Sequence, residues 1–161
     1  MARYEILVKQ PVSGEILELG CHYGYFACLL GKEHKVTAID LDPEFLRIAG
    51  EVARVNNVDI NYERVNAKNL PYEDGQFGTG FMCELLEHLD DPMPILNESI
   101  RVVEKYLYIT TPAKGVMPPA SVPAHKQDFA LDDVVGLAEK AGLKVTDAFA
   151  DKIFNYVFTE R

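Results

Sequence analysis

The sequence has few cysteines, no long apolar run and no leader-like N-terminus. Cys21, Cys28 and Cys83 form no Cys-x-x-Cys pair and leave an odd thiol, which favours a reducing compartment over a disulfide framework. No apolar run approaches the ~20 residues that a membrane-spanning helix needs. The opening stretch MARYEILVKQP has no apolar core of signal-peptide length. We therefore expect a cytoplasmic protein with no membrane partner.

Positive charge is also scarce. The chain has 16 basic residues against 25 acidic ones, a net charge of −9. A surface of this sign repels phosphate backbones, so we expect no nucleic-acid partner. No repeat, low-complexity tract or linker divides the chain. Its 161 residues, of which 48% are hydrophobic and 25% charged, are typical of one globular domain over residues 1–161.

The sequence does contain an alternation of short apolar strands and amphipathic helices. We expect strands over residues 15–19, 35–40, 59–66, 78–83, 106–112, 143–150 and 153–161. We expect helices over residues 23–31, 43–56, 94–105 and 130–142, with a helix or turn after residue 83 and a proline-rich loop over 113–129. This order predicts an α/β fold, a mostly parallel seven-stranded sheet with helices on both faces and an antiparallel member among the closing strands.

Polar residues follow several of the predicted strands. In such folds ligands bind at the carboxyl ends of the strands, near the switch point of the sheet. The segments expected at this edge are Glu18–Gly24, Asp40, Asn66 and Cys83–His88. Asp40 lies twenty residues after Gly20, the spacing at which dinucleotide-binding folds place a ribose-binding carboxylate. The pattern indicates a ligand that contains a ribose.

A nicotinamide dinucleotide is the first ligand to consider, and two features disfavour it. Gly20 and Gly24 have Gly-x-x-x-Gly spacing rather than Gly-x-Gly-x-x-Gly, so the close backbone approach to a pyrophosphate is missing. Glu18 would also face that pyrophosphate with a like charge. A ligand with a ribose, a positive charge and no phosphate avoids both problems. S-adenosylmethionine, with its sulfonium, ammonium and adenosine groups, is such a ligand.

The same residues resemble a known family. ILELGCHYG, VTAIDLDPEFL and VNAKNLPYEDGQF are similar to the first three motifs of class I S-adenosylmethionine-dependent methyltransferases, and the segment from CELLEHLDDP to YLYITTP is similar to the strand, helix and strand that follow them. The resemblance implies a Rossmann-like fold and methyl transfer to a small-molecule acceptor. The cofactor-binding residues that it implies are Glu18, Gly20, His22, Tyr23, Gly24, Asp40, Leu41, Asn66, Ala67 and Cys83.

The resemblance also implies a role for several of these residues. Glu18 would neighbour the methionine amino group or the ribose, and Asp40 would take both ribose hydroxyls. Asn66 and Ala67 would frame the adenine. Cys83 could be a nucleophile, but no partner base is implied and buried cysteines are common, so we interpret it as lining the cofactor.

The sequence departs from the family pattern in several places. His22 stands where the family has a glycine, Gly78 replaces the aspartate that usually follows Phe77, and Asn66 replaces an acid on the adenine side. Only fourteen residues precede Glu15, fewer than the helices that often cover the site in this family. We therefore expect either the 113–129 loop or a second subunit of a homodimer to hold the acceptor.

The stretch ELLEH is a candidate metal site. In a helical conformation Glu84, Glu87 and His88 share one face, and His125 would join them from the long loop as a divalent-cation ligand. The pattern is similar to that of ubiquinone-pathway O-methyltransferases and small-RNA 2′-O-methyltransferases. Their equivalent residues are associated with a divalent cation near the acceptor hydroxyl, where it would lower the hydroxyl's pKa and orient it.

Other interpretations of these residues stay open. LEH also occurs in methyltransferases without a metal, where its Glu and His bind neighbouring loops. His88 is then a catalytic base or a positioning residue. Two further functions compete with small-molecule methylation: a non-catalytic module that binds S-adenosylmethionine, and a metal-dependent RNA 2′-O-methyltransferase.

Overall fold

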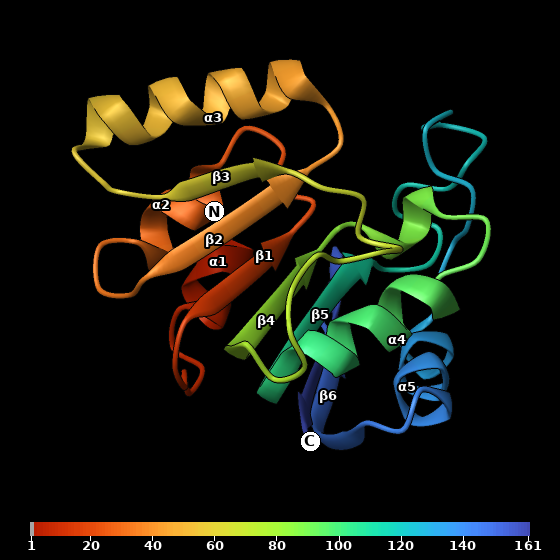
Figure 1. Ribbon diagram of the computed structural model, residues 1–161. Helices are drawn as coiled ribbons and strands as arrows, with labels where there is room; N and C mark the ends of the chain where they lie inside the picture. The colour runs from red at the N-terminus through yellow and green to blue at the C-terminus, as the bar shows by residue number, and fades with distance from the viewer. Residues whose placement is uncertain (1) are drawn as a thin grey trace.

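The computed structural model describes residues 2–161, which contain one seven-stranded sheet of order β3-β2-β1-β4-β5-β7-β6 (Figure 1). The strands are β1 (Ile16–Leu19), β2 (Val36–Asp40), β3 (Asn61–Arg64), β4 (Phe77–Cys83), β5 (Val103–Pro112), β6 (Lys144–Ala150) and β7 (Phe154–Glu160). The helices are α1 (Ala2–Leu7), α2 (Tyr25–Leu30), α3 (Pro43–Asn56), α4 (Met93–Val102) and α5 (Leu131–Lys140), with a 3-10 turn η1 (Leu86–His88).

The predicted α/β, Rossmann-like fold is confirmed. Strands β1 to β5 pair in parallel, and β7 runs antiparallel to both β5 and β6. The expected strand over 59–66 is shorter, at Asn61–Arg64, and the expected helix over 94–105 ends at Val102. Residues 103–105 join β5 instead, because Val103 pairs with Phe77 of β4. No helix in the described part of the chain is long and apolar enough to cross a membrane.

Each face of the sheet buries its own hydrophobic cluster. Side chains of a strand alternate between faces, so Leu17 packs beneath α4 and α5 while its neighbour Ile16 packs beneath α1 and α2. Met82 and Phe81 of β4 divide in the same way. The sheet is therefore covered on both sides, and its loops at the carboxyl ends of β1, β2 and β4 are left open at one edge.

The segment before β1 is tied to the start of β4. The backbone N–H of Ser13 donates to Oγ1 of Thr79 at 2.9 Å, and that hydroxyl donates to the Ser13 carbonyl at 3.0 Å. A Cβ on Gly78 would lie 2.1 Å from the same carbonyl oxygen. This contact explains the glycine at a position where the family usually has an aspartate.

Candidate functional site

A glycine loop crosses the open edge of the sheet between β1 and α2. The N–H groups of Gly20 and Cys21 both donate to the carbonyl of Ile39 in β2, each at 2.9 Å. Gly20 and Gly24 have positive φ angles of 74° and 71°, a region that glycine enters without a Cβ clash. A Cβ on Gly24 would also lie 2.3 Å from the Tyr62 hydroxyl. The two glycines thus allow the loop to fold closely against β2 and β3.

Asp40 stabilises this loop through its carboxylate. Its Oδ2 atom accepts the backbone N–H of His22 at 2.9 Å, and its Oδ1 atom accepts the backbone N–H of Asp42 at 3.0 Å. A carboxylate has about four lone-pair positions, so both oxygens keep room for a further donor. Asp42 caps α3 by accepting the N–H of Glu44 at 2.8 Å.

His22 has a left-handed backbone, with φ at 50°, in the position where the family has glycine. Its exposed ring packs against Tyr23 and Phe45, with centroids 3.8 and 4.2 Å away. The loop therefore keeps the glycine-like conformation at this position. The imidazole of His22 thus packs against Tyr23 and Phe45, and His22 also contributes to the lining of a cavity described below.

Two cavities flank Gly20. One, of about 140 Å³, contains five of the predicted cofactor residues, Gly20, Asp40, Leu41, Asn66 and Ala67. The other, of about 230 Å³, is lined by Arg3, Tyr4, Glu18, Gly20, Cys21, His22, Cys83, Glu84 and His88. Hollows of about 340 and 320 Å³ beside α1 and α2 are larger. They lack the strand-end carboxylates, so the pair around Gly20 is the better candidate site.

Glu18 is a buried and incompletely satisfied group of the 230 Å³ cavity. Its side chain is only 4% exposed, and among residues 2–161 its Oε2 atom has no hydrogen-bond partner. Burial raises the pKa of Glu18 to about 8, although the charge of Arg3 opposes this shift. A buried carboxylate oxygen without a donor is a site for a cationic or hydrogen-donating ligand.

Arg3 is a residue of this site that the sequence did not reveal. It comes from α1, and its Nη1 atom lies 2.9 Å from Oε2 of Glu84. The guanidinium donates to the Tyr4 hydroxyl at 2.7 Å and lies over the Phe154 ring at 4.8 Å. The available signal was an arginine in the short apolar helix ARYEIL, but its place in the cavity depends on how α1 packs on the sheet.

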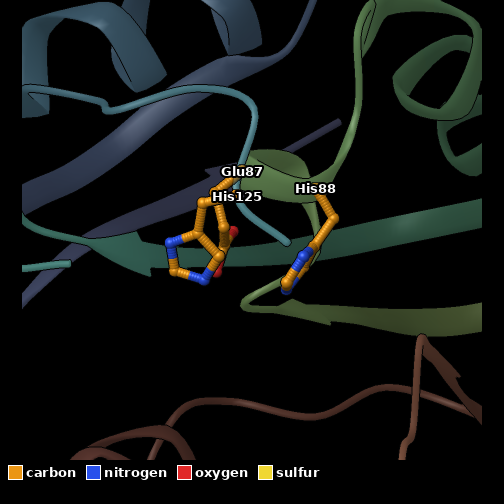
Figure 2. Close-up of side chains that lie close together, drawn as sticks. All are labelled: Glu87, His88 and His125. Atoms are coloured by element: carbon orange, nitrogen blue, oxygen red, sulfur yellow. The ribbon is translucent and has the colours of Figure 1, made fainter. Parts of the chain in front are cut away.

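A second buried carboxylate, that of Glu87, lies next to two histidines (Figure 2), and one of these, His88, lines the 230 Å³ cavity. Ligand atoms of Glu87, His88 and His125 all lie within 4.8 Å of one another. Glu87 is 2% exposed, and neither of its carboxylate oxygens has a hydrogen-bond partner in the described part of the chain. Burial, helped by the charge of Glu84, raises the pKa of Glu87 to about 8.

The hydrogen bonds of the two imidazoles define their tautomers. Nδ1 of His88 lies 3.0 Å from the Ala124 carbonyl, and Nδ1 of His125 lies 2.8 Å from the Met117 carbonyl. A carbonyl only accepts, so in both rings Nδ1 carries the hydrogen. In the neutral ring Nε2 then has a free lone pair. Metal-binding histidines commonly have this arrangement, with the second nitrogen donating to a backbone carbonyl.

Of the four residues predicted to bind a metal, three come together and Glu84 lies apart. Glu84 has a left-handed backbone, with φ at 55°, and does not continue into η1. Its carboxylate accepts the Thr110 hydroxyl at 3.0 Å and pairs with Arg3. The expected helical face of Glu84, Glu87 and His88 does not form, because the chain turns sharply at the end of β4.

Cys83 and Tyr23 are two further residues that the sequence predicted to contact the cofactor. Cys83 is buried at the end of β4, and burial raises the pKa of its thiol. A thiol in this state is a poor nucleophile, which agrees with a lining role. The ring of Tyr23 packs T-shaped against that of Phe45, with centroids 5.2 Å apart.

Residues 17–109 match a family model described as a methyltransferase domain. A ubiquinone biosynthesis O-methyltransferase from Colwellia psychrerythraea is 29% identical over 156 residues, which cover 83% of this chain and 62% of that protein. A norajmaline N-methyltransferase from Rauvolfia serpentina is 30% identical over 103 residues, which cover 62% of this chain and 35% of that protein. The chain spans less than two thirds of each relative.

Solved structures share the fold. The crystal structure of a SAM dependent methyltransferase from Aquifex aeolicus superposes with a TM-score of 0.80 at 23% identity. The match covers 97% of this chain and 87% of that one. At this identity the likeness concerns the arrangement of helices and strands.

Proposed function

The chain belongs to the methyltransferase domain family, and from this premise we propose that it transfers a methyl group from S-adenosylmethionine to a small-molecule acceptor. One observation carries the proposal. Two carboxylates, Asp40 and Glu18, lie on opposite sides of Gly20, in adjoining cavities. A pair of carboxylates in adjoining cavities suits a ligand that has both a ribose and a positive charge.

Each cavity has groups that match one part of this cofactor. Asp40, held by two backbone N–H groups, accepts the ribose hydroxyls. Asn66 and Ala67 lie in the same cavity and face the adenine. The unpartnered oxygen of Glu18 accepts the methionine ammonium group in the second cavity. The cofactor thus crosses Gly20, where a side chain would obstruct it.

In this methyl transfer the main role of the protein is to align the acceptor with the methyl group. S-adenosylmethionine supplies an electrophilic methyl group on its sulfonium. The 230 Å³ cavity, whose lining includes the buried residues Glu18, Cys21 and Cys83, holds the acceptor in line, and this alignment is the main source of acceleration in such a transfer. His88 lines this cavity, and when no cation occupies the Nε2 lone pair, that atom takes the proton that the acceptor loses.

The acceptor that we propose is a small molecule. The two relatives are named for N-methylation of norajmaline and O-methylation in ubiquinone biosynthesis. The net charge of −9 disfavours a polyanionic acceptor such as RNA. Oxygen and nitrogen acceptors both fit a neutral imidazole base.

We further propose that Glu87, His88 and His125 bind a divalent cation. The fit rests on the buried, unpartnered carboxylate of Glu87 and on two imidazoles whose Nε2 lone pairs are free. Two nitrogens and one oxygen are a common ligand set for zinc, cobalt or iron. A divalent cation here supplies Lewis-acid charge that favours ionisation of an acceptor hydroxyl.

Isotope transfer tests the proposed activity. Purified protein is incubated with S-adenosylmethionine labelled in its methyl group and a fractionated cell extract. We expect label in the low-molecular-weight fraction and a loss of about 100-fold for His88→Ala, the typical contribution of a positioned base. His34→Ala, which changes a histidine beside α2 outside the site, serves as the matched control and should retain activity.

The same assay separates the competing functions. Label in the RNA fraction would contradict the small-molecule acceptor. Cofactor binding without transfer to any fraction would favour a non-catalytic binding module. Methyl transfer that is unchanged in excess chelator would contradict the proposed cation site. His88 would then act only as a general base.

A further inference from the structure

The 113–129 loop passes over η1 on its way from β5 to α5 (Figure 1). Backbone hydrogen bonds attach it to the rest of the protein at its two ends. Ala113 donates to the Ile153 carbonyl at 2.7 Å, and Lys126 donates to the Glu87 carbonyl at 2.7 Å. Between these ends, the backbone bonds of the described residues lie within the loop, as from Val122 to Pro118. The segment 114–124 therefore depends on side chains for its attachment.

Both candidate metal-binding histidines contact this segment. His125 is 8% exposed, and its Nδ1 atom bonds the Met117 carbonyl inside the loop. His88 belongs to η1, and its Nδ1 atom bonds the Ala124 carbonyl. The two rings meet edge to face with centroids 4.8 Å apart. The free nitrogens of both rings and the carboxylate of Glu87 thus lie where η1 meets the loop.

We propose that a divalent cation bound by Glu87, His88 and His125 fixes segment 114–124 over the site; this inference rests on the cation site proposed above. Without a cation, η1 and the loop are joined here by the bond between His88 and Ala124, the backbone bond from Lys126 to Glu87 and the packing of the two rings. A cation shared by ligands from η1 and from the loop joins the two elements. Coordination at Nε2 also makes Nδ1–H a stronger donor, which tightens the bonds to Met117 and Ala124. The cation therefore controls access to the acceptor side.

Hydrogen exchange measured by mass spectrometry tests this coupling in the full chain, with Co²⁺ as the probe. Cobalt suits a ligand set of two imidazoles and one carboxylate, and its visible absorption reports binding independently of exchange. We expect amides of residues 114–124 to exchange about fivefold more slowly or better with Co²⁺, because local opening then requires loss of the cation. Chelator should restore the original rate. The turn over residues 65–76 is the internal control and should not change.

A pair of variants tests whether the effect passes through the site. Glu87→Gln keeps the backbone carbonyl that accepts the N–H of Lys126 but weakens cation binding. Without Co²⁺, amides 114–124 of this variant should exchange at the wild-type rate. With Co²⁺, they should not show the slowing that the wild type shows. Glu139→Gln changes an exposed carboxylate on α5 and should behave as the wild type throughout. If Glu87→Gln does not fold, the reversal by chelator in the wild type still decides the question.

The outcomes are distinguishable. Cobalt absorption with no change in exchange would overturn the coupling and leave the cation site standing. No cobalt absorption would overturn the cation site and the coupling with it. Equal slowing of the 65–76 turn would show a general effect of Co²⁺ on the protein and would also overturn the coupling.

Discussion

Asp40 accepts two backbone hydrogen bonds, and these link the carboxylate that we propose for the ribose to the shape of the glycine loop. We expect Asp40→Ala to weaken binding of S-adenosylhomocysteine about thirtyfold, because two ribose hydroxyls lose a charged acceptor worth about 2 kcal/mol. Asp42→Ala is the matched control. It should cost about 1 kcal/mol of folding stability as a lost helix cap and leave the affinity unchanged. Equal affinities of wild type and Asp40→Ala in calorimetric titration would contradict the assignment.

Glu18 makes the stability of the cofactor-free protein depend on pH. Burial raises its pKa from the ordinary 4.5 to about 8, so between these values the folded state holds a proton that the unfolded state has lost. Stability therefore falls as pH rises through this window. We expect a lower urea midpoint at pH 8.5 than at pH 6, and a smaller difference in Glu18→Gln. A variant with the wild-type pH dependence would show that the Glu18 carboxyl is not buried as described.

At the residue scale, the sequence predicted the site residues that belong to a motif at the end of a strand. It did not predict a residue that reaches the site only because its helix packs against the sheet. Glu18 lies one residue before the end of β1 and Asp40 ends the neighbouring β2, so their shared edge could be inferred from chain order. Arg3 could not, because its position depends on α1 packing against the sheet. Glu84 was misplaced because its left-handed backbone directs its carboxylate to Arg3 rather than along a helix with Glu87.

The contact between the N-terminal segment and β4 can be tested with two glycines. Gly78→Ala should destabilise the protein by roughly 1–3 kcal/mol, because its Cβ would meet the Ser13 carbonyl at 2.1 Å. Gly50→Ala in α3 is the control, since a Cβ there meets nothing within 4 Å. It should stabilise by roughly 0.5–1 kcal/mol through helix propensity. Thermal or urea unfolding measures both, and a neutral Gly78→Ala would contradict this packing.

At the element scale, local sequence patterns predicted which helices and strands are present more accurately than the residues at which they end. The amphipathic helix expected over 94–105 ends early because pairing of Val103 with Phe77 recruits its last residues into β5. The segment 84–88 forms only a short 3-10 turn after Glu84. In both places contacts with distant residues outweigh local helical preference, and such contacts are absent from a short window of sequence.

At the scale of the whole molecule, net charge sets the class of partner. A chain with a net charge of −9 has few basic side chains with which to bind the phosphates of RNA. One of them, Arg101, already forms ion pairs with Glu98 and Asp74. We expect no binding of short single- or double-stranded RNA tighter than ~1 µM at physiological salt, with or without cofactor. A fluorescence anisotropy titration checks this. Tighter binding at that salt would contradict a small-molecule acceptor, whereas retention at very low salt alone would reflect diffuse charge attraction.

The proposed activity depends first on S-adenosylmethionine occupying both cavities around Gly20. The most direct measurement is a calorimetric titration of the wild-type protein with S-adenosylmethionine, S-adenosylhomocysteine and NAD. We predict one site per chain with micromolar affinity for both adenosyl compounds. We predict no heat of binding for NAD, because the Gly-x-x-x-Gly loop lacks the close backbone approach that a pyrophosphate needs. Binding of NAD with comparable affinity, or no binding of either adenosyl compound, would contradict the account.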